Sequence, residues 1–145
     1  MTVQRLLDSQ KSIERTYVSP DASIREVLSA LASRNVGALV VSTDGETVEG
    51  IISERDIVRG LNKLGAELLG KSARELMTGK VVTCAATDRA AGVMAIMVSK
   101  HLRHMPVIEG GKLVSMLSIR DLLNLQLIEV QSEADAMRHY IAGDV

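Results

Sequence analysis

The second half of this chain repeats the first half. The segment Ile51–Ile57 (IISERDI) recurs as Met116–Leu122 (MLSIRDL), so that Asp56 and Asp121 stand 65 residues apart. Upstream of both segments the apolar positions also recur, at an offset of 66 residues. A tandem duplication of this size predicts two similar units that pack on each other. Each site formed by one unit is therefore expected to have a counterpart in the other unit.

The composition limits the kinds of partner that this protein can bind. Its 145 residues make one domain or two closely packed half-domains. It has two tyrosines, no phenylalanine or tryptophan, and a net charge of −1. It therefore lacks both the aromatic stacking platforms and the positive charge of a nucleic-acid binder. We expect no nucleic-acid partner.

Two features indicate a cytoplasmic protein. A single cysteine excludes an intramolecular disulfide and fits a reducing compartment. Residues 1–8 lack the apolar run of a signal peptide, and no stretch approaches the roughly 20 apolar residues of a membrane span. We expect no membrane insertion.

Both repeats are expected to follow the order strand, helix, strand, strand, helix. In the first repeat, Ser23 and Glu26 form a capping box that predicts the start of a helix. Asp44-Gly45 is a hairpin signal between two strands. The elements predicted for this repeat are helices from Ile24 to about Asn35 and from Ser53 to about Leu61, and strands at 15–18, 38–42 and 47–52.

The second repeat ends in a helix that is expected to be long. It is predicted to contain a strand at 81–84, a helix at 88–100, strands at 105–109 and 112–117, and a helix that begins near Ser118. Apolar residues then keep a helical spacing to the end of the chain, at Leu123, Leu127, Val130, Ala134, Met137 and Ile141. This stripe is expected to cover a partner subunit or the flank of the domain itself.

Two short helical lead-ins, Val3–Asp8 and Ala73–Thr78, echo each other, and each is expected to belong to one repeat. The predicted division of the chain has three parts. Residues 1–65 are the first repeat with its lead-in, residues 66–124 are a connector and the second repeat, and residues 125–145 are a C-terminal helical extension.

The two Ser-x-x-Asp helix starts admit two interpretations. Ser53 with Asp56, and Ser118 with Asp121, can serve only to cap their helices. A helix N-terminus entered from a strand also presents free N–H groups to an anion. A carboxylate there can accept two hydrogen bonds from a vicinal diol such as that of a ribose. The residues alone leave both interpretations open.

A basic pair distinguishes the two repeats. Arg103-His104 precedes a strand of the second repeat, whereas the first repeat has Gly37-Ala38 at that place. The pair is either a solvated strand end or a phosphate contact that makes the two sites unequal. Cys84 aligns with Val18 and is predicted to be a small core hydrophobe.

Gly65–Ser72 (GAELLGKS) matches the GxxxxGK[ST] pattern of a phosphate-binding P-loop. That pattern needs a buried strand before it, whereas the preceding residues predict a helix, so we expect a connector. Glu67 would also place a negative charge beside a triphosphate. His101 and His139 lack metal-ligand spacing, and no metal cluster or set of catalytic residues can be assembled. The sequence therefore indicates neither an enzyme nor a catalytic cofactor.

Four segments resemble cystathionine-β-synthase (CBS) domains: Val18–Ile24 (VSPDASI), Gly50–Asp56 (GIISERD), Leu76–Thr78 (LMT) and His104–Ile108 (HMPVI). The resemblance covers nearly the whole chain in two copies, as in a tandem CBS pair, or Bateman module, of the short stand-alone bacterial type. It implies an α+β fold of two β-α-β-β-α repeats packed with pseudo-two-fold symmetry, followed by a long C-terminal helix. It also implies a regulatory homodimer that binds adenosine-containing nucleotides, such as AMP, ADP, ATP, NAD(H) or S-adenosylmethionine, in clefts between the repeats.

The resemblance also implies which residues bind the nucleotide. The ribose hydroxyls would be held by the aspartates Asp56 and Asp121. The ribose or the first phosphate would be contacted by the serines Ser53 and Ser118. The candidates for phosphate are the basic residues Arg55, Arg103, His104 and Arg120. The adenine is expected near Val18 in one cleft and near Cys84 and Pro106 in the other, with Ala38 and Met105 also among the binding residues.

The sequence departs from the family pattern at two places. Ser115 stands where the first repeat has Gly50, and Val40 stands where the second repeat has Pro106. A Cβ at the glycine position restricts the backbone. The two clefts are therefore expected to differ in affinity.

The favoured interpretation is a homodimeric nucleotide sensor that acts on an enzyme or transporter. A nucleotide would act by shifting the populations of two arrangements of the repeats. A first alternative is a protein interaction module with vestigial clefts, whose C-terminal helix docks a regulated enzyme or transporter. A second is a nucleotide-hydrolysing enzyme that uses the P-loop-like segment.

Overall fold

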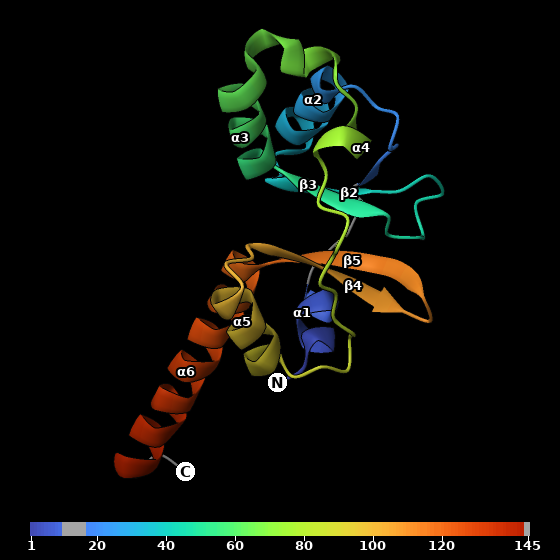
Figure 1. The fold of residues 1–145 in the computed structure, drawn as a ribbon. Helices are drawn as coiled ribbons and strands as arrows, with labels where there is room; N and C mark the ends of the chain where they lie inside the picture. The colour runs from blue at the N-terminus through green and yellow to red at the C-terminus, as the bar shows by residue number, and fades with distance from the viewer. Residues whose placement is uncertain (10–16, 144–145) are drawn as a thin grey trace.

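The computed structural model describes residues 1–9 and 17–143 and shows an α+β fold in which each repeat has its own sheet and helices (Figure 1). The first repeat contains β1 (Tyr17–Val18), α2 (Ile24–Arg34), β2 (Ala38–Val41), β3 (Gly50–Ser53) and α3 (Glu54–Leu64). The second contains α5 (Ala90–Ser99), β4 (His104–Glu109), β5 (Lys112–Ser118) and α6 (Ile119–Ile141). The lead-ins are the short helices α1 (Val3–Ser9) and α4 (Ala73–Leu76). Residues 15 and 16 of the first predicted strand lie outside the described residues.

Each sheet is built around one antiparallel pair of strands. β2 pairs antiparallel with β3 and parallel with β1, which gives the order β1-β2-β3. β4 pairs antiparallel with β5 over a longer stretch that contains a bulge between Val107 and Ile108. The strand predicted at 81–84 is wrong in extent, because only Cys84 pairs, as a single parallel bridge to Val107. Val81 and Val82 line a cavity instead.

The connection between β2 and β3 is longer than the predicted hairpin, because the Asp44 carboxylate closes a turn of its own. Its Oδ1 atom accepts hydrogen bonds from the backbone N–H groups of Glu46, at 2.8 Å, and Thr47, at 2.7 Å. These two bonds, led by the one from Thr47, hold the pKa of Asp44 well below its usual range. Strand pairing therefore resumes only at Gly50 rather than at Thr47.

The predicted helix starts are confirmed by their caps. The Ser23 side chain accepts from the Glu26 N–H, and Glu26 accepts in return from the Ser23 N–H. α2 ends at Asn35, whose left-handed conformation (φ 51°) closes the helix. Ser53 and Ser118 occupy the N-cap positions of α3 and α6.

The lead-ins pack against the core of the opposite repeat, which corrects the prediction that each belongs to its own. Val3 and Leu6 of α1 are buried in the core formed by α5, β4, β5 and α6. Ala73 of α4 is buried in the core formed by α2, β2, β3 and α3. The apolar spacing of a short helix shows which face is buried but not against which core, so the sequence could not reveal this crossing.

Backbone hydrogen bonds fix the crossed lead-ins in place. The Ala73 N–H donates to the Ala22 carbonyl at 2.8 Å, just before α2. The Val3 N–H donates to the Asp88 carbonyl at 2.9 Å, just before α5. The chain after α4 must therefore run from the first repeat to the second, and it passes between them.

α6 continues well past the second core. Leu122 and Leu125 are buried in that core, and beyond Glu129 the helix projects away from the body of the molecule (Figure 1). A predicted long C-terminal helix is thus confirmed. Within residues 1–9 and 17–143, no helix has both the length and the apolar content to cross a membrane.

Candidate functional site

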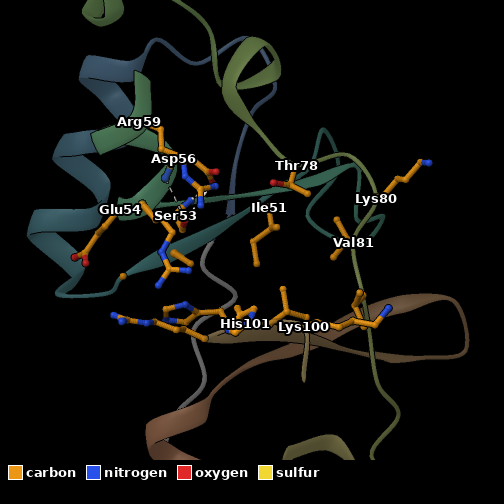
Figure 2. Close-up of a pocket in the computed structure, with 17 residues that line it drawn as sticks. Ile51, Ser53, Glu54, Asp56, Arg59, Thr78, Lys80, Val81, Lys100 and His101 are labelled. Carbon is orange, nitrogen blue, oxygen red and sulfur yellow. Dashed lines mark hydrogen bonds between the residues drawn. The ribbon is translucent and has the colours of Figure 1, made fainter. Parts of the chain in front are cut away.

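A cavity of about 480 Å³ lies between the two repeats (Figure 2). Its walls come from three parts of the chain: the β2–β3–α3 region of the first repeat, the segment that crosses between the repeats, and the turn that leads from α5 into β4. The principal lining residues are Gly37, Ala38, Ile51, Ser53, Glu54, Arg55, Asp56 and Arg59, then Thr78, Lys80, Val81 and Val82, then Lys100, His101, Leu102, Arg103 and His104. Its volume is in the range of small-molecule sites.

The N-terminus of α3 opens into this cavity. The Asp56 Oδ2 atom accepts hydrogen bonds from the Ser53 N–H at 2.8 Å and from the Ser53 hydroxyl at 3.1 Å. The Asp56 N–H donates to Ser53 Oγ at 3.4 Å, which completes a capping box. Both described bonds to the carboxylate use Oδ2, and a carboxylate has further acceptor sites on its other oxygen. Capping therefore leaves Asp56 able to accept from a ligand.

The N-terminus of α6 is capped less completely. The Asp121 N–H donates to Ser118 Oγ at 3.1 Å, but among the described residues the Asp121 carboxylate makes no return bond to the Ser118 N–H. Capping thus accounts for Ser118 and not for the carboxylate of Asp121.

The cavity carries an excess of positive charge. It is lined by two carboxylates, Glu54 and Asp56, and by five fully charged bases: Arg55, Arg59, Lys80, Lys100 and Arg103. The partial positive charge of the α3 N-terminus adds to this excess. Arg55 and Arg59 come from the first repeat and Lys100 and Arg103 from the second, so both repeats contribute cations to the cavity lining. Such a cleft attracts anions.

His104 of the second repeat lies against Gly37 of the first repeat. A Cβ atom on Gly37 would lie only 3.1 Å from His104 Cε1, so glycine makes room for the imidazole. Burial lowers the pKa of His104, while the charges of Glu54 and Asp121 act against this effect and Arg103 adds to it. His104 therefore interacts with an acidic group at each of the two helix starts, Glu54 at α3 and Asp121 at α6.

The structure brings six of the predicted site residues into one cavity. These are Ala38, Ser53, Arg55, Asp56, Arg103 and His104. Ser118, Arg120 and Asp121 lie at the start of α6 and do not line it. By the sequence repeat, the counterpart of the crossing segment around Lys80 falls within residues 10–16, which lie outside the described residues.

The remaining predicted residues lie away from this cavity. Cys84, Met105 and Pro106 are buried in the second repeat, and Val18 is half-buried against the first core. Burial raises the pKa of the Cys84 thiol to about 11, with a smaller effect from Asp88. Cys84 thus behaves as the predicted core residue.

Sequence reasoning missed the wall contributed by the crossing segment. Thr78 is held to β3 by two hydrogen bonds, from its N–H to the Ile51 carbonyl at 2.9 Å and from the Ile51 N–H to its carbonyl at 3.1 Å. This places Lys80, Val81 and Val82 in the lining of the same cavity as Asp56. The only local signal is the Val81-Val82 pair after Lys80, and its apolar pattern predicts a strand rather than a cavity wall.

The P-loop interpretation of Gly65–Ser72 is wrong. Gly65–Gly70 is a 3₁₀ segment that follows the helix α3, not a strand. Ser72 caps α4 with Glu75. The segment is the connector that the sequence favoured. In the described part of the chain no three His, Cys, Asp or Glu side chains are grouped to hold a metal ion.

Comparison with known proteins identifies the class of fold. The CBS domain family model matches residues 11–63 and again residues 73–127. The chain belongs to the CBS domain family, and it carries two CBS domains in tandem.

Individual relatives agree with this assignment. The mitochondrial CBS domain-containing protein CBSX3 of Arabidopsis thaliana is 29% identical over 131 residues, which cover 88% of this chain and 64% of that protein. The crystal structure of the CBS-domain protein ATU1752 from Agrobacterium tumefaciens is 36% identical, with a TM-score of 0.82, and the match covers 87% of this chain and 99% of that one. The CBS domain protein PAE2072 from Pyrobaculum aerophilum, solved in complex with AMP, is 30% identical with a TM-score of 0.70, covering 83% and 89%.

Proposed function

We propose that this protein is a regulatory module that binds a phosphorylated adenosine nucleotide in the cavity between its two CBS repeats. The observation that carries the proposal is the presence, in one cavity of about 480 Å³, of a helix-start carboxylate and five cationic side chains. The AMP bound to the relative from Pyrobaculum aerophilum supports an adenosine ligand.

Each part of the nucleotide has matching residues in the cavity. The Asp56 carboxylate would accept hydrogen bonds from the ribose diol, next to Ser53. Val81, Val82 and Ile51 offer apolar surface to the adenine. The phosphates would lie among the cations, which include Arg55, Arg59, Arg103 and Lys100. Positive charge favours AMP, ADP, ATP or NAD(H) over the cationic S-adenosylmethionine.

A second, weaker cleft is proposed at the start of α6. Ser118, Arg120 and Asp121 would contribute to it, with Val18 from the first repeat. Ser115 of β5, which stands where the first repeat has Gly50, is buried. Because a Cβ at this position restricts the backbone, we predict that the cleft at the start of α6 binds nucleotide more weakly than the cavity at the start of α3.

The proposed role is that of a sensor rather than an enzyme. Nucleotide binding would change the arrangement of a homodimer and thereby act on a separate enzyme or transporter in the cytoplasm. In this proposal residues 1–65 and 66–124 carry the two CBS repeats, and residues 125–145 form the C-terminal helical extension.

The proposal is tested by comparing Asp56→Ala with Glu26→Ala. Each carboxylate completes a capping box, but only Asp56 lines the cavity. We expect Asp56→Ala to weaken nucleotide binding by roughly 10- to 100-fold, because it removes charge-assisted hydrogen bonds worth about 1.5–3 kcal/mol. Both variants lose a capping box, so they should lower the free energy of unfolding by similar amounts. Glu26→Ala should leave the nucleotide affinity unchanged.

Titration calorimetry with AMP, ADP, ATP, NAD, NADH and S-adenosylmethionine gives the readout. A ligand at about 100 times its dissociation constant should also add roughly 2.7 kcal/mol to the free energy of unfolding. Lys71→Ala, in the P-loop-like segment, should have no effect on affinity. Failure of all six ligands to bind the unmodified protein would overturn the proposal.

The exposed apolar face of α6 favours one alternative, an interaction module whose clefts bind nothing. Leu127, Val130 and Met137 on that face are all exposed. This alternative predicts that no nucleotide changes the melting temperature and that the dimer stays intact in Asp56→Ala.

A further inference from the structure

Six apolar residues of α6 follow a heptad pattern, and all of them except the half-buried Ala134 are exposed. Successive members are four, three, four, three and four residues apart: Leu123, Leu127, Val130, Ala134, Met137 and Ile141. This 4-3 alternation is the spacing of the a and d positions of a coiled coil, with Leu127, Ala134 and Ile141 at a. The pattern extends over about 27 Å of helix, at 1.5 Å per residue.

This apolar seam does not face the body of the protein. Leu122 and Leu125 pack into the second core, and Glu129 forms an ion pair with Arg5 of α1. These residues lie about 100° or more around the helix axis from the centre of the seam. The seam itself is open: the exposed fractions are 67% for Leu127, 55% for Val130, 69% for Met137 and 80% for Ile141.

We propose that the seam binds the α6 helix of a second copy of this chain, in a parallel, in-register two-stranded coiled coil. Beyond Glu129 no other described element of the chain covers this face (Figure 1), so it can be buried only by another molecule. The self-complementary 4-3 spacing fits an identical helix, whose a and d residues meet their own counterparts. Ala134, near the middle, lets the two backbones approach closely.

Two charged residues set the orientation. Glu133 precedes Ala134 and occupies a g position, whereas Arg138 follows Met137 and occupies an e position, so they flank the seam on opposite sides. In a parallel pair, each g residue faces the e residue five positions further along the other helix. Glu133 of each copy then meets Arg138 of the other, which gives two reciprocal ion pairs.

The antiparallel arrangement lacks this complementarity. With the six apolar residues fully overlapped, it places Glu133 opposite Glu133 of the second copy. Like charges at facing positions oppose association. The side chain of Arg138 can reach a second copy, because it is 78% exposed. Within its own helix it forms only a long ion pair of 3.8 Å with Asp135, which is itself exposed.

The first experiment compares Leu127→Asp with Ile128→Asp in the full chain by sedimentation equilibrium. The two residues are neighbours with nearly equal exposure, 67% and 63%, but only Leu127 lies in the seam. Both changes place an aspartate in the same helix, and the helix propensities of Leu and Ile differ by only roughly a few tenths of a kcal/mol. We expect Leu127→Asp to raise the dimer dissociation constant at least about 10-fold and Ile128→Asp to leave it within about twofold. A monomeric unmodified protein, or equal effects of both changes, would overturn the proposal.

The second experiment tests the parallel register. Met137→Cys should form a covalent dimer on mild oxidation, because residue 137 meets itself only in the in-register parallel pair. The buried native Cys84 does not compete. Ala136→Cys, which points away from the seam, is the control. Cross-linking of Met137→Cys only to a Leu127→Cys chain would show an antiparallel pair and overturn the assignment.

A charge exchange isolates the ion pairs. Glu133→Arg and Arg138→Glu should each weaken the homodimer, and a mixture of the two variants should form a heterodimer more tightly than either forms with itself. Absence of that preference would contradict the paired charges. Asp56→Ala should leave the dimer intact, so failure of this inference and failure of nucleotide binding are distinguished.

Discussion

Gly50 lies where the first sheet packs against Met77 and Thr78, at the start of the crossing segment. A Cβ atom there would lie 2.3 Å from Met77 Sδ and 3.1 Å from the Thr78 carbonyl oxygen. The sulfur can move with its flexible side chain, but the carbonyl belongs to the backbone that holds Thr78 to Ile51. Glycine therefore lets the wall of the cavity pack directly against β3.

We predict that Gly50→Ala lowers the free energy of unfolding by about 1–3 kcal/mol, the usual cost of overpacking. It should also weaken nucleotide binding, because it pushes Thr78 and the residues after it away from Asp56. Gly79→Ala is the control, since a Cβ at that position meets nothing within 4 Å. Urea denaturation and calorimetry measure the two effects. Equal behaviour of the two variants would contradict this account of Gly50.

His104 predicts a pH dependence of stability. Burial is the largest cause that lowers its pKa below the ordinary 6.5, so the unfolded chain binds the proton more readily than the folded chain does. The free energy of unfolding should therefore fall as pH decreases from about 6.5 and level off below the folded pKa. His104→Asn should reduce this slope in denaturation curves between pH 7 and pH 5. The exposed His101→Asn is the control, and an unchanged slope in His104→Asn would refute the assignment.

Among the secondary-structure elements, α1 has the clearest energetic role. It contributes Val3 and Leu6 to the core of the second repeat although it stands at the start of the first. We predict that Leu6→Ala lowers the free energy of unfolding by about 2–4 kcal/mol, as for a buried leucine. Leu61→Ala, on an exposed part of α3, should change it by about 0.5 kcal/mol or less. Chemical denaturation of both variants gives the comparison, and a small effect of Leu6→Ala would show that α1 is dispensable.

The sequence predicted those elements whose signals are local. Ser23 and Glu26 marked the start of α2, and the apolar spacing after Ser118 predicted the long helix α6. The 65-residue repeat also gave the equivalence of Asp56 and Asp121. Local signals of this kind depend on residues within one turn or one helix face.

The features that the sequence did not predict depend on contacts between distant segments. The crossing of α1 and α4 is set by which core each short helix reaches. That crossing places Lys80, Val81 and Val82 in the wall of the same cavity as Asp56, whereas the local pattern of residues 81–84 predicts a strand. The sequence repeat aligns Gly37 with Arg103 but does not show that His104 packs against Gly37, because this contact joins the two repeats.

At the scale of the whole molecule, the exchanged lead-ins predict a single unfolding transition. Each core contains a helix from the other side of the chain, so neither core can open alone without exposing apolar surface. Val27→Ala, in the first core, and Val93→Ala, in the second, should therefore lower the midpoint of the same transition.

Cys84 supplies a local probe for that prediction. It is buried in the second core, and its thiol pKa is raised to about 11, so it should react with a thiol reagent only when that core opens. Its reactivity should follow the loss of helical circular dichroism at the same denaturant concentration. Val27→Ala, which is remote from Cys84, should shift both curves together, and separate transitions would show that the repeats unfold independently.

The crossed lead-ins also bear on how such a chain can arise. A single repeat with its own lead-in cannot close its core, because that helix reaches across to the other unit. Two copies of one repeat close both cores only by exchanging helices, which is the arrangement of a domain-swapped dimer. The tandem chain has the form of that dimer joined end to end, so a gene duplication followed by fusion preserves every contact already made between two separate molecules.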